Sequence, residues 1–432
     1  MKKILLFLLP VVMFSCKKNT PKHDQPLENY SSDLVKDWID LQLKVIKNAT
    51  GITHVAYSRH FAYTGVALYE ALEKGDNRFN SIAAQLNGSI NLPSLPPGKK
   101  LFYPAAANSA IAAMLRFFYS ANASSVQSID SLEQVYINRH KAEIAGYADI
   151  TEALTYGRQI ATSVIEWSKH DGSTEANIPY TPLGEGYWEP TAPGFVAANV
   201  PGWGNNRTIL KGSILGTMPP APIAFSKVPG SAFYNMAKEL FDISLALTPE
   251  QKALANFWDD APNGKYLTAF GHWFSVLSQV IDMENCNILK AADAYLRLGI
   301  SLHESIISCW QAKYTYHQIR PITYIQKHMG HPEWKSLITT PPHPEYSAAH
   351  ATLSASAGYA LESVFGKNYS FTDHSYDGIG MSPRTYSSFE AAGYDAGLSR
   401  LYGGIHYKPS IEAGNTQGKK VGKSVEKILK SL

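Results

Sequence analysis

Residues 344–354 read PEYSAAHATLS, a stretch with the pattern of a helix that begins at small residues. His350 stands in the expected first turn, directly after Ser347, Ala348 and Ala349. The N-terminus of a helix favours an anion, because free backbone N–H groups and the helix dipole both point at it. Small side chains would let the anion approach the backbone. An ordinary capped helix with a core histidine explains the same residues, so this stretch alone does not decide between the two.

A second segment, KYTYHQIRP, occupies residues 313–321. The spacing of Lys313, His317 and Arg320 predicts that they share one helix face, and the proline after Arg320 predicts that the helix ends there. Because the preceding residues IISCWQAKY are largely apolar, we expect this helix to be buried. A buried cation needs an anion. A solvated helix face remains the alternative for this segment taken alone.

A third segment, SRLYGGIHYKPS, occupies residues 399–410. Arg400 and His406 lie on either side of Gly403 and Gly404, and two glycines allow a close backbone approach or a tight turn. The chain has 14 histidines, and many of them follow residue 300. The expected chemistry therefore lies in the C-terminal half.

The order and spacing of these three segments resemble the superfamily of type 2 phosphatidic acid phosphatases and vanadium-dependent haloperoxidases. Upstream stretches resemble its bacterial haloperoxidase-like branch, so the resemblance covers most of the chain. These stretches are RHFAYTGVALYEAL at 59–72, YWEPTAP at 187–193, PGWG at 201–204, LTPEQKALANFWDD at 247–260 and GHWFSVL at 271–277.

The resemblance implies a pocket for vanadate or phosphate, whose oxygens are bound by cationic side chains and one backbone N–H. The oxyanion-binding residues that it implies are Lys313, Arg320, Ala349 and Arg400. The catalytic residues are His350 and His406, and His406 is also the expected ligand of the vanadate. The residues expected to support them are His317, Ser347 and Ser399.

Two activities fit such a site. In a haloperoxidase, vanadate is the cofactor, hydrogen peroxide and a halide are the substrates, and His350 exchanges protons with the peroxide. In an acid phosphatase, His406 would attack the phosphorus of a phosphomonoester and His350 would protonate the leaving oxygen. We expect the haloperoxidase. The phosphatase and an inactive anion-binding lipoprotein are the alternatives.

Two positions depart from the family pattern. The pattern Pro-Ser-Gly-His is replaced by Ser347-Ala348-Ala349-His350, so the hydroxyl that would donate to the oxyanion is missing at Ala348. Ser347 stands one position early, where we expect it to cap the helix. The phosphatase pattern also has an aspartate four residues after the second histidine, and here that residue is Ser410. An imidazole without an orienting carboxylate is a poorer nucleophile, which disfavours the phosphatase more than the haloperoxidase.

The composition predicts a large all-α protein. Of 432 residues 45% are apolar, and a net charge of +3 with no long basic tract gives no reason to expect a nucleic-acid partner. Apolar residues recur at helical spacing and no alternating run predicts a sheet. The predicted helices are 32–48, 57–74, 104–121, 125–146, 149–169, 232–246, 249–258, 267–285 and 288–319.

The expected organisation has two parts. Residues 31–230 form an N-terminal helical half, and residues 231–432 form the domain that carries the site. Residues 171–231 are rich in proline and glycine, which predicts a long loop. Two tryptophans in this loop indicate that it is ordered and packs on the helices.

The first residues, MKKILLFLLPVVMFSCKKNT, predict export. The Ser15-Cys16 pair resembles the end of a bacterial lipoprotein signal, so we expect a signal peptide over 1–15, a lipidated Cys16 and a polar tether over 16–30. The protein would then be anchored to a bacterial membrane, on the periplasmic or cell-surface side, through the lipid alone. No later stretch has 18 uninterrupted apolar residues. An ordinary signal peptide is the alternative.

Overall fold

The computed structural model describes residues 25–144 and 150–430, and this part of the chain is mostly helical. The all-α prediction is confirmed, and the helices listed above lie within a few residues of their predicted bounds. The predicted signal peptide, Cys16 and most of the tether lie outside the described residues. No described helix combines the length and the apolar character that a membrane span requires.

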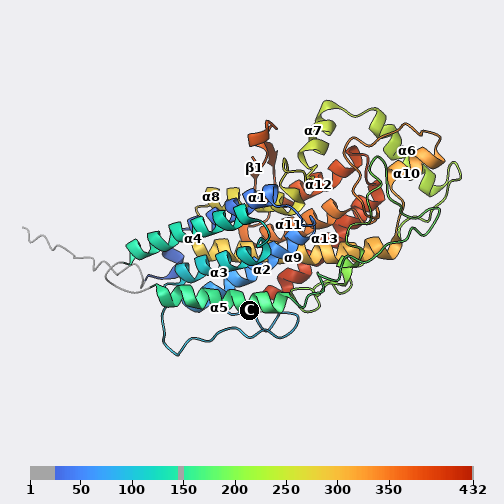
Figure 1. Cartoon of the computed structure of the whole chain (residues 1–432). Helices are drawn as coiled ribbons and strands as arrows, with labels where there is room; N and C mark the ends of the chain where they lie inside the picture. Colours follow the sequence, from blue (N-terminus) through green and yellow to red (C-terminus); the bar gives the residue numbers. More distant parts are fainter. Residues whose placement is uncertain (1–24, 145–149, 431–432) are drawn as a thin grey trace, which may run out of the picture.

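Five helices form the N-terminal half (Figure 1). Its centre is α2, which packs against α3, α5 and α9 and has a buried side chain at nearly every position. The bounds are α1 (Asp33–Asn48), α2 (Ala56–Leu72), α3 (Tyr103–Phe118), α4 (Ala123–Glu143) and α5 (Thr151–Ser168). Short 3₁₀ turns lie at η2 (Leu27–Asn29), η3 (Glu73–Gly75), η4 (Pro201–Asn205) and η5 (Asp377–Ile379).

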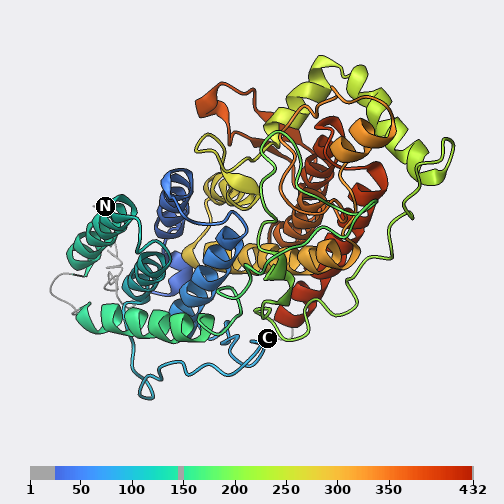
Figure 2. The ribbon, with the colours of Figure 1, turned by 45° about the vertical axis from the view of Figure 1, so that its right-hand side comes forward.

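The longest helix, α9 (Ile288–Tyr316), connects the two halves, and Figures 1 and 2 show it running between them. Its 29 residues span about 43 Å at 1.5 Å per residue. The Asn287 side chain caps its N-terminus by accepting from the Lys290 N–H at 2.9 Å. One side of α9 packs on α2, and the other side packs on α11 and α13. The predicted site residue Lys313, near the C-terminus of α9, is thereby buried at the centre of the molecule.

The helices of the C-terminal half are α6 (Ala232–Leu245), α7 (Pro249–Phe257), α8 (Thr268–Met283), α10 (Pro321–His328), α11 (Ala349–Phe365), α12 (Phe389–Tyr402) and α13 (Lys408–Leu429). Among them, α11 and α13 pack most extensively on α9, and α8 packs on α1 as well as on α9. Small residues allow α11, α12 and α13 to approach one another closely. A Cβ at Gly418 of α13 would lie only 2.1 Å from the carbonyl oxygen of Thr352 in α11. This close packing holds the N-terminus of α11 in place.

The predicted helix through Arg320 is wrong. Helix α9 ends at Tyr316, and His317 has a left-handed backbone with φ 49°. Arg320 has an extended backbone and is the N-cap of α10. The proline at 321 explains the difference, because it disfavours a helical conformation at the residue before it and is well suited to begin a new helix. Lys313 and Arg320 therefore approach the site from two different elements.

The loop 171–231 is ordered and crosses the C-terminal helices, as Figure 2 shows for its green trace. Trp188 and Trp203 are at most 1% exposed. Backbone hydrogen bonds fix the loop, from Trp188 N–H to the His317 carbonyl at 2.6 Å and from Asn199 N–H to the Pro342 carbonyl at 2.8 Å. The loop is thus held against the segments that carry the predicted site.

A two-stranded antiparallel sheet was not predicted. It pairs β1 (Phe371–Asp373) with β2 (Arg384–Tyr386), and Phe371 lies opposite Tyr386. Three residues are too few to show an alternating pattern in the sequence. The hairpin has a role in the site, because it carries Asp373 into the buried network described below.

Candidate active site

His406 lies between α12 and α13 and is 2% exposed. Its Nδ1 lies 2.8 Å from Oε1 of Glu345, and the same oxygen accepts from the Tyr407 N–H at 3.0 Å. Burial and the nearby Arg320 hold the pKa of His406 well below its usual range, so the ring is neutral. Because Glu345 accepts from Nδ1, this is the protonated nitrogen, and the lone pair of Nε2 accepts from Arg320. Burial raises the pKa of Glu345 to about 7, against the opposing effect of Arg320 and Lys313. The sequence had suggested that His406 lacks such a partner because Ser410 replaces an aspartate; Glu345 supplies it instead.

Arg320 approaches His406 directly. Its Nη1 lies 3.2 Å from His406 Nε2 and donates to the Ile405 carbonyl at 2.9 Å. Its Nη2 bonds Nδ1 of His343 at 2.9 Å, and its Nε donates to the His343 carbonyl at 2.8 Å. The guanidinium is fully buried, and burial lowers its pKa to about 10.

Lys313 supports the backbone that leads into α11. Its Nζ donates to the carbonyl oxygens of Pro344, Glu345 and Ser347, at 2.8, 3.0 and 2.7 Å. Burial lowers the pKa of Lys313 to about 7, while three carbonyl acceptors favour its charged form. Lys313 thus positions Glu345 and the start of α11 as well as adding positive charge behind His406.

Arg400 lies near the C-terminus of α12 and lines the same cavity as His406. Its Nε donates to the Ser399 hydroxyl at 3.0 Å, and its other nitrogens donate to backbone carbonyls that include those of Trp258 and Asp259. Ser399 donates in turn to the Ala396 carbonyl at 2.6 Å. The predicted supporting residue Ser399 therefore holds the arginine directly.

These three cations share an unusual environment. Lys313, Arg320 and Arg400 are each at most 2% exposed. Within the described residues 25–144 and 150–430, none of the three forms an ion pair with a carboxylate. Their positive charges all act on His406 and lower its pKa. Glu345 acts on Lys313 and Arg320 only from beyond ion-pair distance, as Asp259 and Asp260 do on Arg400. Burying cations without a direct anionic partner is costly, so this arrangement favours an anion beside His406.

His350, in the first turn of α11, is held by a carboxylate from a distant part of the chain. Its Nε2 lies 3.2 Å from Oδ2 of Asp260. Burial and Arg400 lower the pKa of His350 to about 4, against the opposing effect of Asp260. The ring is therefore neutral at pH 7, with its proton on the nitrogen that faces Asp260.

Asp260 belongs to a buried chain of charges. His272 bonds Asp260 Oδ1 through Nδ1 and Asp373 Oδ2 through Nε2, both at 2.9 Å. Burial disfavours a charged imidazole, but the two carboxylates together raise the pKa of His272 to about 10. The Tyr376 hydroxyl also donates to Asp260, at 2.5 Å. Asp260 is therefore fixed as an ionised group, and it fixes His350.

The N-terminus of α11 differs from the sequence expectation at Ser347. The N-cap residue is Ala348, which makes no side-chain cap. The Ser347 hydroxyl donates instead to Gln417 of α13 at 2.5 Å, so the predicted cap is wrong. Ser347 contributes through its carbonyl, which accepts from Lys313. No described residue accepts a hydrogen bond from the Ala349 N–H, which is therefore free to donate to an anion.

A cavity of about 420 Å³ joins these groups. Ala349, His350, Arg400 and His406 all line it. Arg320 adjoins it through His343 and Ile405, which are also lining residues. His317 lies apart, because its ring packs on Tyr180 at a centroid distance of 5.6 Å and its carbonyl holds the long loop.

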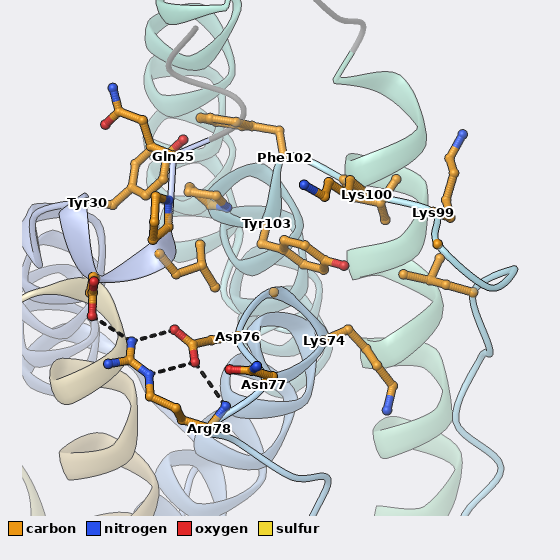
Figure 3. A pocket seen from close by; sticks show the side chains of 18 of the residues that line it. Gln25, Tyr30, Lys74, Asp76, Asn77, Arg78, Lys99, Lys100, Phe102 and Tyr103 are labelled. Carbon is orange, nitrogen blue, oxygen red and sulfur yellow. Dashed lines mark hydrogen bonds and ion pairs between the residues drawn. The ribbon is translucent and has the colours of Figure 1, made fainter. Parts of the chain in front are cut away.

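A larger hollow of about 720 Å³ lies in the N-terminal half (Figure 3). It contains several basic side chains, of which Lys74, Arg78 and Lys99 pair with acidic residues. Arg78 pairs with Asp76 and Glu28, and Lys99 pairs with Glu152 at 2.6 Å. Figure 3 shows that the amines of Lys74 and Lys99 point apart. This hollow lacks a convergent set of charged groups, unlike the cavity at His406.

Comparison with known proteins identifies the family. A bacterial vanadium-dependent iodoperoxidase has a similar structure, with a TM-score of 0.84 and 31% sequence identity over 93% of this chain and 97% of the iodoperoxidase chain. This chain belongs to the vanadium-dependent haloperoxidases. The resemblance found in the sequence is thereby confirmed. Residues 293–432 also match the family model of the VCPO second helical-bundle domain.

Two further structures share the fold of this haloperoxidase. They are a holo-type and an apo-type bacterial vanadium-dependent chloroperoxidase, with TM-scores of 0.68 and 0.63. Their sequence identities are 16% and 15%, over 87% and 88% of this chain and 92% and 95% of theirs. No curated protein matches the chain.

Several buried residues that hold the two histidines of this haloperoxidase were not predicted. Glu345 stands in the quoted stretch PEYSAAH, and Asp260 ends the quoted stretch LTPEQKALANFWDD. Both carboxylates therefore stand in stretches that the sequence had singled out. Nothing in the sequence indicated that Glu345 contacts His406 or that Asp260 contacts His350. The buried His272–Asp373 pair had no local signal, because its partners lie 101 residues apart.

Proposed function

We propose that this chain is a vanadate-dependent haloperoxidase that oxidises a halide with hydrogen peroxide in the cavity at the N-terminus of α11. The observation that carries the proposal is the set of three buried cations without a carboxylate partner among the described residues. A tetrahedral oxyanion satisfies this need, since each of its oxygens can accept charge-assisted hydrogen bonds.

The donor set fits vanadate. Arg320 and Arg400 would hold its oxygens, together with the N–H of Ala349. Lys313 would act through its positive charge, because its three N–H donors already bond carbonyl oxygens. His406 would hold it through Nε2, the nitrogen that the Glu345 contact leaves with a lone pair. Bound vanadate supplies a Lewis acid that activates peroxide toward attack by halide.

The roles of the two histidines follow from their partners. Nε2 of His350 faces the Asp260 carboxylate and so carries the hydrogen, which leaves Nδ1 as the basic nitrogen. A neutral imidazole can accept a proton from peroxide and return it to a leaving oxygen. His406 stays neutral and keeps its lone pair, because burial and the cations beside it oppose protonation.

Acid phosphatase activity is the second candidate, and the Glu345–His406 contact favours it. A histidine nucleophile needs a carboxylate that fixes its tautomer, and Glu345 meets this need at 2.8 Å. The same cations would bind a phosphomonoester. The absence of an aspartate at position 410 is therefore no argument against this activity.

The test is a pair of assays on one purified sample of the full chain. Halide oxidation is measured with vanadate and peroxide, and phosphomonoester hydrolysis is measured without them. We expect vanadate-dependent halide oxidation that falls at least a hundredfold in His350→Ala and His406→Ala. Hydrolysis without halide oxidation would overturn the proposal in favour of the phosphatase. Inactivity in both assays, with vanadate bound, would indicate an anion-binding protein.

A further inference from the structure

An open groove in the N-terminal half lies between α5 and the connection from α2 to α3. It measures about 560 Å³, which is within the size range of small-molecule sites, about 300–1,000 Å³. Figures 1 and 2 both show this connection running beside α5, and the Ser163 hydroxyl donates to the Asn91 carbonyl between the two at 2.5 Å. Residues 88–91, the C-terminal turns of α5 and Arg207 line the groove.

Arg207 brings a positive charge to this groove. Its guanidinium lies over the Trp167 ring, 4.0 Å from the ring centroid. Its Nη1 donates to the Asn87 carbonyl at 2.5 Å, and its Nη2 donates to the Trp167 carbonyl at 2.7 Å. No carboxylate among the described residues forms an ion pair with Arg207, and the neighbouring Asp171 pairs with Arg59 instead. The guanidinium is therefore fixed in place and has no anion of its own.

The Trp167 indole adds a donor to the same place. Trp167 is 7% exposed, and no described residue accepts a hydrogen bond from its Nε1. A Cβ at Gly88 would lie 3.4 Å from this Nε1 and 3.4 Å from Nη1 of Arg207. The two nitrogens thus converge on the space that the missing side chain of Gly88 leaves. Because Nη1 carries two hydrogens and the Asn87 carbonyl takes one, both nitrogens can donate to a ligand oxygen there.

The charges of the groove select an anion with a single negative charge. Arg207 is a single unpaired cation, so a carboxylate neutralises it and gains a charge-assisted hydrogen bond. Glu166 also lines the groove, where it pairs with Lys169 at 2.6 Å. This second carboxylate repels a dianion such as a phosphate monoester more strongly than a monoanion.

The walls select the rest of the ligand. Ser89, Asn91 and Thr162 line the groove with exposed polar side chains, which suit a molecule with several hydroxyl groups. A sugar acid combines such hydroxyls with one carboxylate. A hexuronate has about 13 heavy atoms, which need roughly 390 Å³ at ~30 Å³ each, the share of a water molecule. The groove therefore has room for one such ring.

We propose that this groove binds a uronate, whose carboxylate accepts from Arg207 Nη1 and Trp167 Nε1 and whose hydroxyls bond the polar walls. The uronate is either a free sugar acid or a residue of a polysaccharide, since both present the same carboxylate and hydroxyls. The site is separate from the cavity at His406, because none of its lining residues lines that cavity.

The experiment measures binding to the full chain by calorimetry, with glucuronate as the probe and with no vanadate, peroxide or halide present. Glucose offers the hydroxyls without a carboxylate, and acetate offers a carboxylate without hydroxyls. We expect glucuronate to bind more tightly than either compound, by about tenfold for each hydrogen bond that the compound cannot form. Methyl glucuronide mimics a linked uronate. Affinity equal to that of glucuronate would identify a polysaccharide as the source, and loss of binding would identify the free acid.

Trp167→Phe tests the donor inside the groove, because it removes the N–H and keeps an aromatic ring under Arg207. We expect glucuronate to bind about tenfold more weakly, which corresponds to one lost hydrogen bond. Trp203→Phe is the matched control. Trp203 is 1% exposed, its Nε1 also lacks a partner among the described residues, and it lies outside the groove. This control should leave the affinity unchanged, and thermal unfolding shows whether each variant is folded.

A second pair of variants changes only exposed positions of α5, where the fold is not at risk. Thr162→Asp places a negative charge in the groove, and we expect it to prevent glucuronate binding by repelling the carboxylate. Thr155→Asp is the control. Thr155 is exposed on the same helix and lies outside the groove, and each of the two hydroxyls donates to the carbonyl four residues earlier at 2.9 Å.

The outcomes decide the proposal. Glucuronate binding that both groove variants weaken and both controls retain would support the site. Acetate binding as tight as glucuronate binding would overturn the assignment of a sugar acid. Absence of glucuronate binding, or an equal loss in Thr155→Asp, would overturn the site itself. None of these measurements involves halide oxidation, so a failure here leaves the proposed haloperoxidase function standing.

Discussion

Replacing Glu345 tests how this site prepares His406. The Glu345 carboxylate is fully buried and accepts from two donors, His406 Nδ1 and Tyr407 N–H. Glu345→Ala removes the acceptor of both donors at a buried position, at up to about 1–3 kcal/mol for each donor that stays unpaired. It also frees the imidazole to rotate or to change tautomer. Loss of such a partner behind a metal-binding histidine typically lowers affinity about 10–100-fold, and we expect that loss for vanadate.

Glu345→Gln separates charge from geometry. The amide oxygen can still accept a hydrogen bond. At pH 8, above the pKa of about 7 to which burial raises Glu345, a bond to the charged carboxylate contributes about 1 kcal/mol more than a neutral one. We therefore expect vanadate to bind about fivefold more weakly to Glu345→Gln than to the parent protein, which is a smaller loss than in Glu345→Ala.

The assay is vanadate affinity by calorimetry, with thermal unfolding to show that each variant is folded. Glu304→Gln is the matched control. Glu304 is also fully buried and lies nine residues before Lys313 on α9, where it accepts from the Leu210 N–H at 2.9 Å. Burial raises its pKa to about 8, so the change to glutamine is conservative. If both Glu345 variants bound vanadate as tightly as the control, the assignment of His406 as an oriented ligand would be refuted.

Three further predictions concern other parts of the site and the fold. His272→Gln should lower the free energy of unfolding by about 3–5 kcal/mol. In denaturant titrations, the double variant with Asp373→Asn should lose less stability than the two single variants lose together. Additive losses would show that the pair is not coupled. Ala348→Ser should stabilise the protein by about 1 kcal/mol, because serine caps the N-terminus of α11, and should tighten vanadate binding up to about tenfold. Unchanged vanadate affinity in calorimetry would show that the backbone N–H groups and the cations suffice to bind the anion. Burial lowers the pKa of His140 to about 4 from its ordinary 6.5, so its contribution to the free energy of unfolding is present above pH 6.5 and is lost as the pH falls toward 4. His140→Gln should remove up to about 3 kcal/mol of this pH dependence. If the slope of stability against pH in unfolding titrations is unchanged, His140 is not buried as a neutral ring.

The helices and the family could be read from the sequence because their signals are local. Apolar residues at helical spacing placed α1 to α9 within a few residues, and the strongest signal was α9, whose 29 residues are buried on most sides. The failures have a different cause at each place. The turn at His317 depends on Pro321 and on the loop that bonds the His317 carbonyl, and β1 and β2 are too short for a pattern.

The chemical types of the site were likewise visible in the sequence, whereas their pairing was not. The sequence alone supplied the cations Lys313, Arg320 and Arg400 and the histidines 350 and 406, because their order and spacing along the chain resemble those of a known family. Which carboxylate holds which histidine was decided by the tertiary structure. Glu345 reaches His406 across 61 residues, and Asp260 reaches His350 across 90. Hydrogen bonds between residues so far apart leave no periodicity in the chain. The Glu345–His406 contact depends on the packing of α11 against α12 and α13, and the Asp260–His350 contact depends on the packing of α8 against α11 and of α7 against α12.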